Sequence, residues 1–127
     1  MQKVVVRRFE VGPNGTYGKL IAPGLECYTI EPLPPDLVGA GSYRASWTKH
    51  PTRLTPSGNK EYGYRIERAS KFADPFIRHT DPAPGDIVLC RAILEGMPAS
   101  SFDAFSALVT QLDKRPFELT IRNGFEP

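Results

Sequence analysis

The chain has 127 residues, of which 40% are hydrophobic and 24% charged, and its formal net charge at pH 7 is +2. This composition is typical of a soluble globular protein, and the length predicts one domain over residues 1–127. A net charge this small, carried by scattered basic residues, argues against a nucleic-acid partner. No stretch approaches the roughly 20 apolar residues of a membrane span, so we expect no membrane partner either.

The N-terminal residues 1–9 have the pattern of a strand and lack the apolar run and small-residue cleavage site of a secretory signal peptide. We therefore expect synthesis in the cytoplasm of the host cell. Two cysteines, Cys27 and Cys90, are too few for a disulfide scaffold. Whether they pair is left open, with reduced thiols as the default in cytosol.

Most of the chain has the pattern of short β-strands, with alternating or β-branched residues between Pro- and Gly-rich turns. The expected strands cover residues 4–9, 18–21, 25–30, 41–45, 64–67, 87–94 and 117–121. Ala22-Pro23-Gly24 separates the second strand from the third and predicts a hairpin, because Gly tolerates a positive φ. Residues 50–62 are polar and contain prolines, and they predict a long loop.

One helix is expected from about Ser100 to Lys114, with a serine at its N-cap and Pro116 beyond its end. Apolar residues recur at helical spacing within it. They are Phe102, Phe105, Leu108, Val109 and Leu112. The predicted fold class is therefore α+β, a single mainly antiparallel β domain with this helix of the C-terminal half packed on the sheet.

The chemistry-bearing residues gather in one segment, where His79, Asp86 and Cys90 lie in a stretch rich in Pro and Gly. Turns could fold this segment so that imidazole and thiol meet, and a neighbouring His can generate the thiolate that a cysteine nucleophile needs. The alternative is that Cys90 is a small buried residue of a strand and His79 a loop residue. The residues alone favour this alternative, because free Cys is among the most buried residue types.

No cofactor and no metal ion are expected. The glycine pairs within residues 12–15 and 39–41 lack the following helix and the lysine of a phosphate-binding loop. The two His and two Cys are too dispersed for a metal site, apart from the pair His79 and Cys90.

Five motifs follow one another in an order that resembles a known family. They are Arg8, the Thr16-Tyr-Gly18-Lys-Leu20 segment, Gly24 with Cys27-Tyr-Thr29-Ile30-Glu31, Gly39-Ala-Gly41-Ser-Tyr43, and the trio His79, Asp86 and Cys90. Within the trio the spacings of seven and four residues match without gaps. The chain resembles a family of short phage- and prophage-associated domains of unknown function, whose signature is His-Ala-Gly-Asn, Asp and Gly-Cys.

That signature is similar to the active site of L,D-transpeptidases, which act on peptidoglycan stem peptides. The resemblance implies Cys90 as nucleophile, His79 as base and Asp86 as an orienting or structural acid. Two departures put this activity in doubt. Leu89 replaces the Gly before the nucleophile, where a side chain obstructs close approach. Pro82 lies where the family has Asn and offers no backbone N–H.

Two functions therefore remain open. The first is a phage-associated structural or interaction module, a virion or tail component with a degraded site, whose partners are other phage structural proteins. It would be made in the host cytoplasm and carried in the virion. The second is a peptidoglycan-directed cysteine transpeptidase or peptidase. The altered signature favours the first, and a buried Cys90 thiol would favour it further, whereas an open cleft beside Cys90 and His79 would favour the enzyme.

Overall fold

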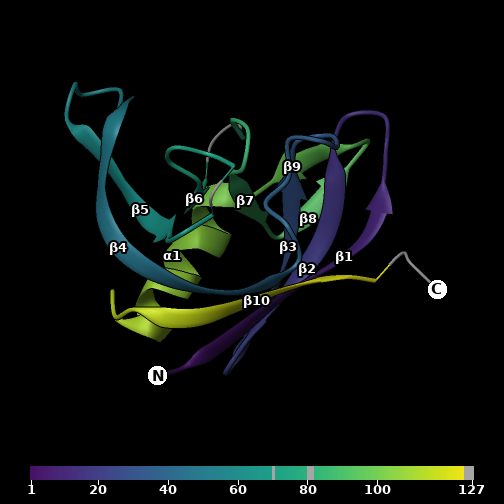
Figure 1. The fold of residues 1–127 in the computed structure, drawn as a ribbon. Coiled ribbons are helices and arrows are strands. Elements are labelled where there is room, and N and C mark those ends of the chain that lie inside the picture. Colours follow the sequence, from purple (N-terminus) through teal and green to yellow (C-terminus); the bar gives the residue numbers. More distant parts are fainter. Residues whose placement is uncertain (70, 80–81, 125–127) are drawn as a thin grey trace.

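The computed structural model describes residues 1–69, 71–79 and 82–124. These residues form ten strands and one helix (Figure 1). The elements are β1 (Lys3–Val11), β2 (Thr16–Ala22), β3 (Leu25–Glu31), β4 (Gly41–Leu54), β5 (Lys60–Ile66), β6 (Phe76–Arg78), β7 (Ile87–Cys90), β8 (Ala92–Leu94), β9 (Met97–Ala99), α1 (Ser101–Leu112) and β10 (Phe117–Asn123).

Eight strands close into a barrel in the order β1-β10-β4-β5-β6-β7-β3-β2, and β8 and β9 form a separate hairpin. Neighbouring barrel strands are antiparallel except for β1 with β10 and β6 with β7, which are parallel. The predicted α+β fold, a mainly antiparallel sheet with a helix packed on it, is therefore wrong. The sheet closes because the first strand pairs with the last, from Lys3 beside Glu118 to Arg8 beside Asn123. Strand patterns in the sequence do not reveal this pairing.

The barrel interior is filled by apolar side chains from every one of its strands, as the two-residue period of a strand requires. One interior residue from each strand is Val4, Leu20, Cys27, Ala45, Tyr64, Ile77, Leu89 and Leu119. The helix α1 adds Ala104, Phe105, Leu108 and Leu112 to the same cluster. It forms within the predicted residues, and among the described residues no helix is long and apolar enough to cross a membrane.

The polar segment 50–62 is mostly strand and not the predicted loop. β4 continues to Leu54 and β5 starts at Lys60, so the two form a hairpin that extends past the barrel (Figure 1). His50 stabilises an irregularity in β4, because its Nδ1 accepts the backbone N–H groups of Thr52 at 3.1 Å and Arg53 at 3.0 Å. Local composition could not predict this strand, since side-chain hydrogen bonds and pairing with β5 hold it.

Two short strands, β6 and β9, were also missed, and the expected strand 87–94 is interrupted at Arg91. The interruption lets β8 turn away from the barrel wall and pair with β9. A three-residue strand carries too little periodicity to be recognised in a sequence.

Candidate functional site

Asp86 lies directly before β7 and is buried. Its Oδ1 accepts the backbone N–H of Phe76 at 2.9 Å, and its Oδ2 accepts the backbone N–H of Ala83 at 3.0 Å. The same Oδ2 accepts a hydrogen bond from Arg78 Nη1 at 3.3 Å. Both carboxylate oxygens are thus engaged in holding β6 beside the turn that precedes β7.

Arg78 connects Asp86 to a second acid that the sequence analysis missed. Its Nη2 lies 2.9 Å from Glu61 Oε2, and only 2% of the Arg78 side chain is exposed. His50 lies close to this cluster, and burial followed by the positive charge of Arg78 lowers the pKa of its imidazole. One sequence feature could have indicated this cluster, because Arg78 directly follows the apolar pair Phe76-Ile77. An arginine buried in a strand needs acidic partners to neutralise its charge.

His79 is half-buried and packs on the helix. Its ring centroid lies 5.3 Å from that of Phe102 and 5.2 Å from that of Phe105, and Phe105 belongs to the interior cluster. The imidazole therefore faces α1. The two residues that follow His79 in the signature, 80 and 81, lie outside the described residues.

Cys90 lies in a different environment. Its neighbour Leu89 belongs to the interior cluster, whereas fully buried Cys90 belongs to a second cluster with Tyr17 and Ile30, against which Ile93 of the β8–β9 hairpin packs. Burial raises the pKa of the Cys90 thiol to about 11, although a backbone hydrogen bond with Ala99 partly opposes this. The thiol is therefore protonated at neutral pH.

The three residues of the trio make separate contacts in the structure. No hydrogen bond joins Cys90 to His79 or to Asp86 among the described residues. Cys27 is buried as well, burial raises its pKa to about 12, and both cysteines are free thiols. The catalytic roles that the resemblance implies stay predictions.

Two other motif residues, Arg8 and Glu31, form a buried ion pair. Arg8 Nε and Nη2 donate to the two carboxylate oxygens of Glu31 at 3.0 and 2.8 Å. Arg8 also donates to the Val38 carbonyl at 2.6 Å and to Asn123 Oδ1 at 3.1 Å. Burial raises the pKa of Glu31, and its hydrogen bonds to Arg8 oppose that rise. The motif order drew attention to both residues, but only the fold pairs them.

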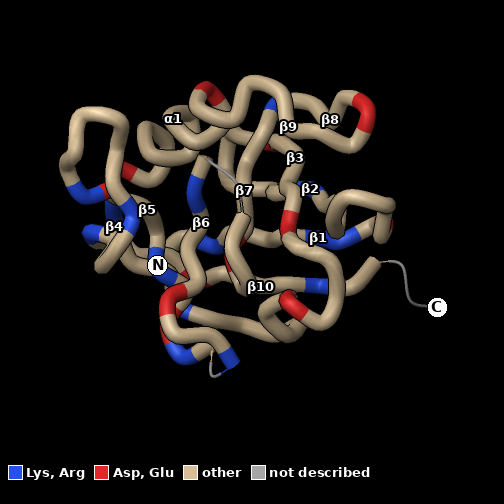
Figure 2. Tube along the Cα trace, turned by 90° about the horizontal axis from the view of Figure 1, so that it is seen from above, with Lys and Arg blue, Asp and Glu red and all other residues tan. Residues whose placement is uncertain are grey.

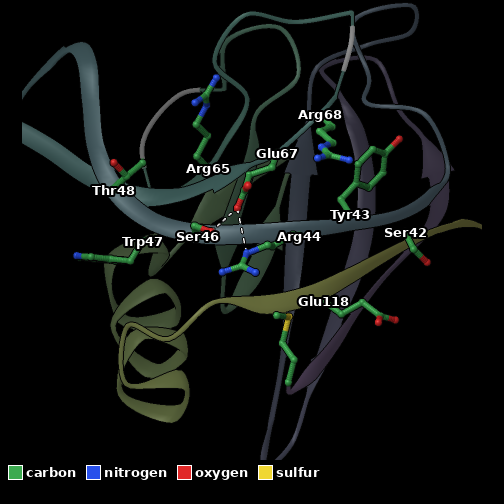
Figure 3. A pocket seen from close by; sticks show the side chains of 11 residues that line it. Ser42, Tyr43, Arg44, Ser46, Trp47, Thr48, Arg65, Glu67, Arg68 and Glu118 are labelled. Atoms are coloured by element: carbon green, nitrogen blue, oxygen red, sulfur yellow. Dashed lines mark hydrogen bonds and ion pairs between the residues drawn. The ribbon is translucent and has the colours of Figure 1, made fainter.

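One concavity is a shallow face outside β4, β5 and β10, with a volume of about 1100 Å³ (Figure 3). We call it the concave face. Glu67 lies within it, where its Oε2 accepts a hydrogen bond from Ser46 Oγ and lies 3.4 Å from Arg44 Nε. Arg65 and Arg68 also line it, and Figure 2 shows basic positions gathered along β4 and β5. A face that carries both acidic and basic side chains together with hydroxyl groups can form hydrogen bonds and ion pairs with another polar surface.

Among the described residues, no group of three or more His, Cys, Asp or Glu side chains is placed to hold a metal ion. Comparisons with protein-family models, curated proteins and solved structures found no match to this chain. Function is therefore inferred from the geometry of the chain itself.

Proposed function

We propose that this protein is a non-catalytic structural or interaction module of the phage-associated kind that its motifs resemble. The observation that carries the proposal is the environment of Cys90, which is fully buried among Tyr17, Ile30 and Ile93, and burial raises the pKa of its thiol to about 11. A cysteine acyltransferase needs an accessible thiolate, a base and oxyanion donors. Asp86 is committed to Arg78 and to backbone amides, so it is not free to orient a histidine.

The concave face supports a role in binding. Non-obligate protein interfaces are about as polar as the rest of the surface, and Arg is enriched in them. Arg68 is exposed on this face, has a left-handed backbone with φ of 60°, and makes no ion pair with a described residue. We assign this face to another structural protein of the particle, with assembly after synthesis in the host cytoplasm.

The catalytic question is tested by incubating the chain with muropeptides and analysing the products by mass spectrometry. We expect no turnover by the wild type or by Cys90→Ser. As a second readout, native protein at pH 7.4 should react slowly with a thiol reagent at both cysteines and rapidly once unfolded. Turnover that disappears in Cys90→Ser would overturn the proposal and establish the alternative, a peptidoglycan-directed cysteine enzyme.

The structural role is tested in phage particles purified from the source strain. The wild-type chain should be detected in them by mass spectrometry, and Arg68→Glu should reduce its incorporation. Arg91→Glu is the matched control, because Arg91 is an exposed arginine between β7 and β8 and does not line the concave face. Absence of the wild-type chain from particles, or equal loss with both variants, would contradict this role.

A further inference from the structure

A second concavity, of about 480 Å³, is lined by residues of β1, β2, β3 and the β8–β9 hairpin. Its lining includes Phe9, Glu10, Tyr17, Tyr28 and Ile93, and we call it the aromatic groove. Its volume falls within the range of small-molecule sites. Neither the signature residues nor the concave face contributes to it.

A β-bulge builds one wall of the groove. The pairing of β1 with β2 shifts between Arg8 and Glu10, which leaves Phe9 as an extra residue. Successive side chains of a regular strand point to opposite faces, but Phe9 and Glu10 both line the groove. Bulges re-aim side chains in this way and recur beside functional sites. The bulge therefore places an aromatic ring and a carboxylate in one concavity.

The rings form a corner. Phe9 is 41% exposed and Tyr28 is 37% exposed, and their ring centroids lie 6.4 Å apart with an interplanar angle of 76°. Tyr17 lies deeper, and its hydroxyl has no hydrogen-bond partner among the described residues. Two glycines leave room for the Tyr17 ring. A Cβ added at Gly12 would lie 2.3 Å from Tyr17 Cε2, and a Cβ added at Gly96 would lie 3.0 Å from the Tyr17 hydroxyl oxygen.

The charge of the groove is negative. Glu10 is exposed, makes no ion pair with a described residue, and is the only charged side chain among the described residues that line the groove. The chain has 16 Lys and Arg, yet none of them lines the groove. Lys19, which pairs with Tyr28 across β2 and β3, is held by Glu26 at 3.3 Å. Aromatic faces carry negative electrostatic potential and attract cations.

We propose that the aromatic groove binds an organic cation, an alkylammonium head group that Glu10 neutralises and the rings of Phe9, Tyr17 and Tyr28 surround. Three aromatic rings with one carboxylate are the arrangement that recognises methylated ammonium groups elsewhere. Cys90 packs with Tyr17 and Ile93, which line the groove, but Cys90 itself does not line it. The proposal therefore does not depend on whether Cys90 is catalytic.

The test uses the full chain and isothermal titration calorimetry with choline. The neutral isostere 3,3-dimethylbutan-1-ol has the same shape without the charge, and we expect it to bind at least about tenfold more weakly. Equal binding of the two would overturn the assignment, since a merely apolar groove does not distinguish them. Absence of choline binding, or binding of N-acetylglucosamine oligomers in its place, would overturn it as well.

Variants locate the site. Glu10→Gln should weaken choline binding several-fold, and Phe9→Leu and Tyr28→Leu should weaken it by about tenfold, because leucine keeps apolar bulk but lacks the π face. Tyr62→Leu is the matched control, since Tyr62 is an exposed tyrosine that stacks on Trp47, away from the groove. Far-ultraviolet circular dichroism should be unchanged in all four variants. Equal weakening by Tyr62→Leu would contradict the proposed location.

Discussion

The two buried arginines of the barrel, Arg8 and Arg78, are neutralised in different ways. Arg8 faces one carboxylate, Glu31, and otherwise donates to neutral oxygens. Arg78 lies between two carboxylates, Glu61 and Asp86, each within 3.3 Å. Both arginines belong to a parallel strand pair, β1 with β10 or β6 with β7. The buried charges therefore lie at the two parallel pairings of the barrel.

Because the two arginines have different numbers of acidic partners, we expect loss of Arg8 and loss of Arg78 to have different consequences. Burial raises the pKa of Glu31, so this carboxyl can take a proton if Arg8 is lost. Loss of Arg78 instead leaves two acids close together without their counter-ion. The signature acid Asp86 is thus a counter-ion of a structural arginine.

The largest effect is expected from Arg78→Met, which we predict to lower the free energy of unfolding by about 3–5 kcal/mol. The reason is that Glu61 and Asp86 would remain buried without a positive partner. Urea denaturation at pH 7 measures the loss. Lys71→Met is the control, since Lys71 is exposed, and a loss no greater than that of the control would contradict the structural role of the cluster.

Arg8→Met should cost less, about 3 kcal/mol at pH 7, and its cost should depend on pH. Because burial raises the pKa of Glu31 above its ordinary value of 4.5, the folded chain retains this proton to higher pH than the unfolded chain does. The stability lost in the variant should therefore shrink as the pH falls from 7 toward 4.5. Denaturation curves across this range check the trend, and a deficit that grows at low pH would contradict it.

The double variant Arg8→Met/Glu31→Leu should be more stable than either single variant. Replacing both members of a buried ion pair by apolar groups avoids the uncompensated charge that each single change leaves. We expect a coupling energy of about 1–3 kcal/mol from a double-mutant cycle. Additive losses would show that Arg8 acts mainly through Val38 and Asn123, and not through Glu31.

The smallest effect is a loss of stability in mild acid through His50. Burial and Arg78 lower the pKa of His50 from its ordinary value of 6.5, so the unfolded chain takes up this proton more readily. The contribution of neutral His50 is present above pH 6.5 and is lost as the pH falls through its folded pKa. Asp74, Asp86 and Arg53 are the other charges that act on this imidazole.

Thermal denaturation between pH 7 and 5 measures this loss. His50→Asn should flatten the response, because asparagine offers Thr52 and Arg53 an acceptor that does not titrate in this range. An unchanged slope in His50→Asn would assign the acid sensitivity to another group.

Parts of the candidate site could be predicted from the sequence. The segment from His79 to Cys90 holds two fully buried residues, Asp86 and Cys90, whose contacts the sequence did not predict. Asp86 was expected to be an orienting or structural acid, and it binds Arg78 and backbone amides, while Cys90 packs with Tyr17. Sequence spacing can place residues on neighbouring strands. It cannot predict which side chain of the barrel each of them contacts.

Local pattern determined most of the strands and the helix. Alternation in residues 4–9 and 117–121, the turn at 22–24 and the helical spacing between Phe105 and Leu112 all express short-range sterics and side-chain direction. These are properties of neighbouring residues, and they are the same whether a sheet is open or closed.

Tertiary structure decided the closure of the barrel, the hairpin in residues 50–62 and the burial of Cys90. Each depends on a partner distant in sequence: β10 for β1, Arg78 for Glu61, and Tyr17 with Ile30 for Cys90. Such pairings are selected by the free energy of burying apolar surface while neutralising the charges enclosed with it. That balance is a property of the whole packed chain, and no local window of the sequence contains it.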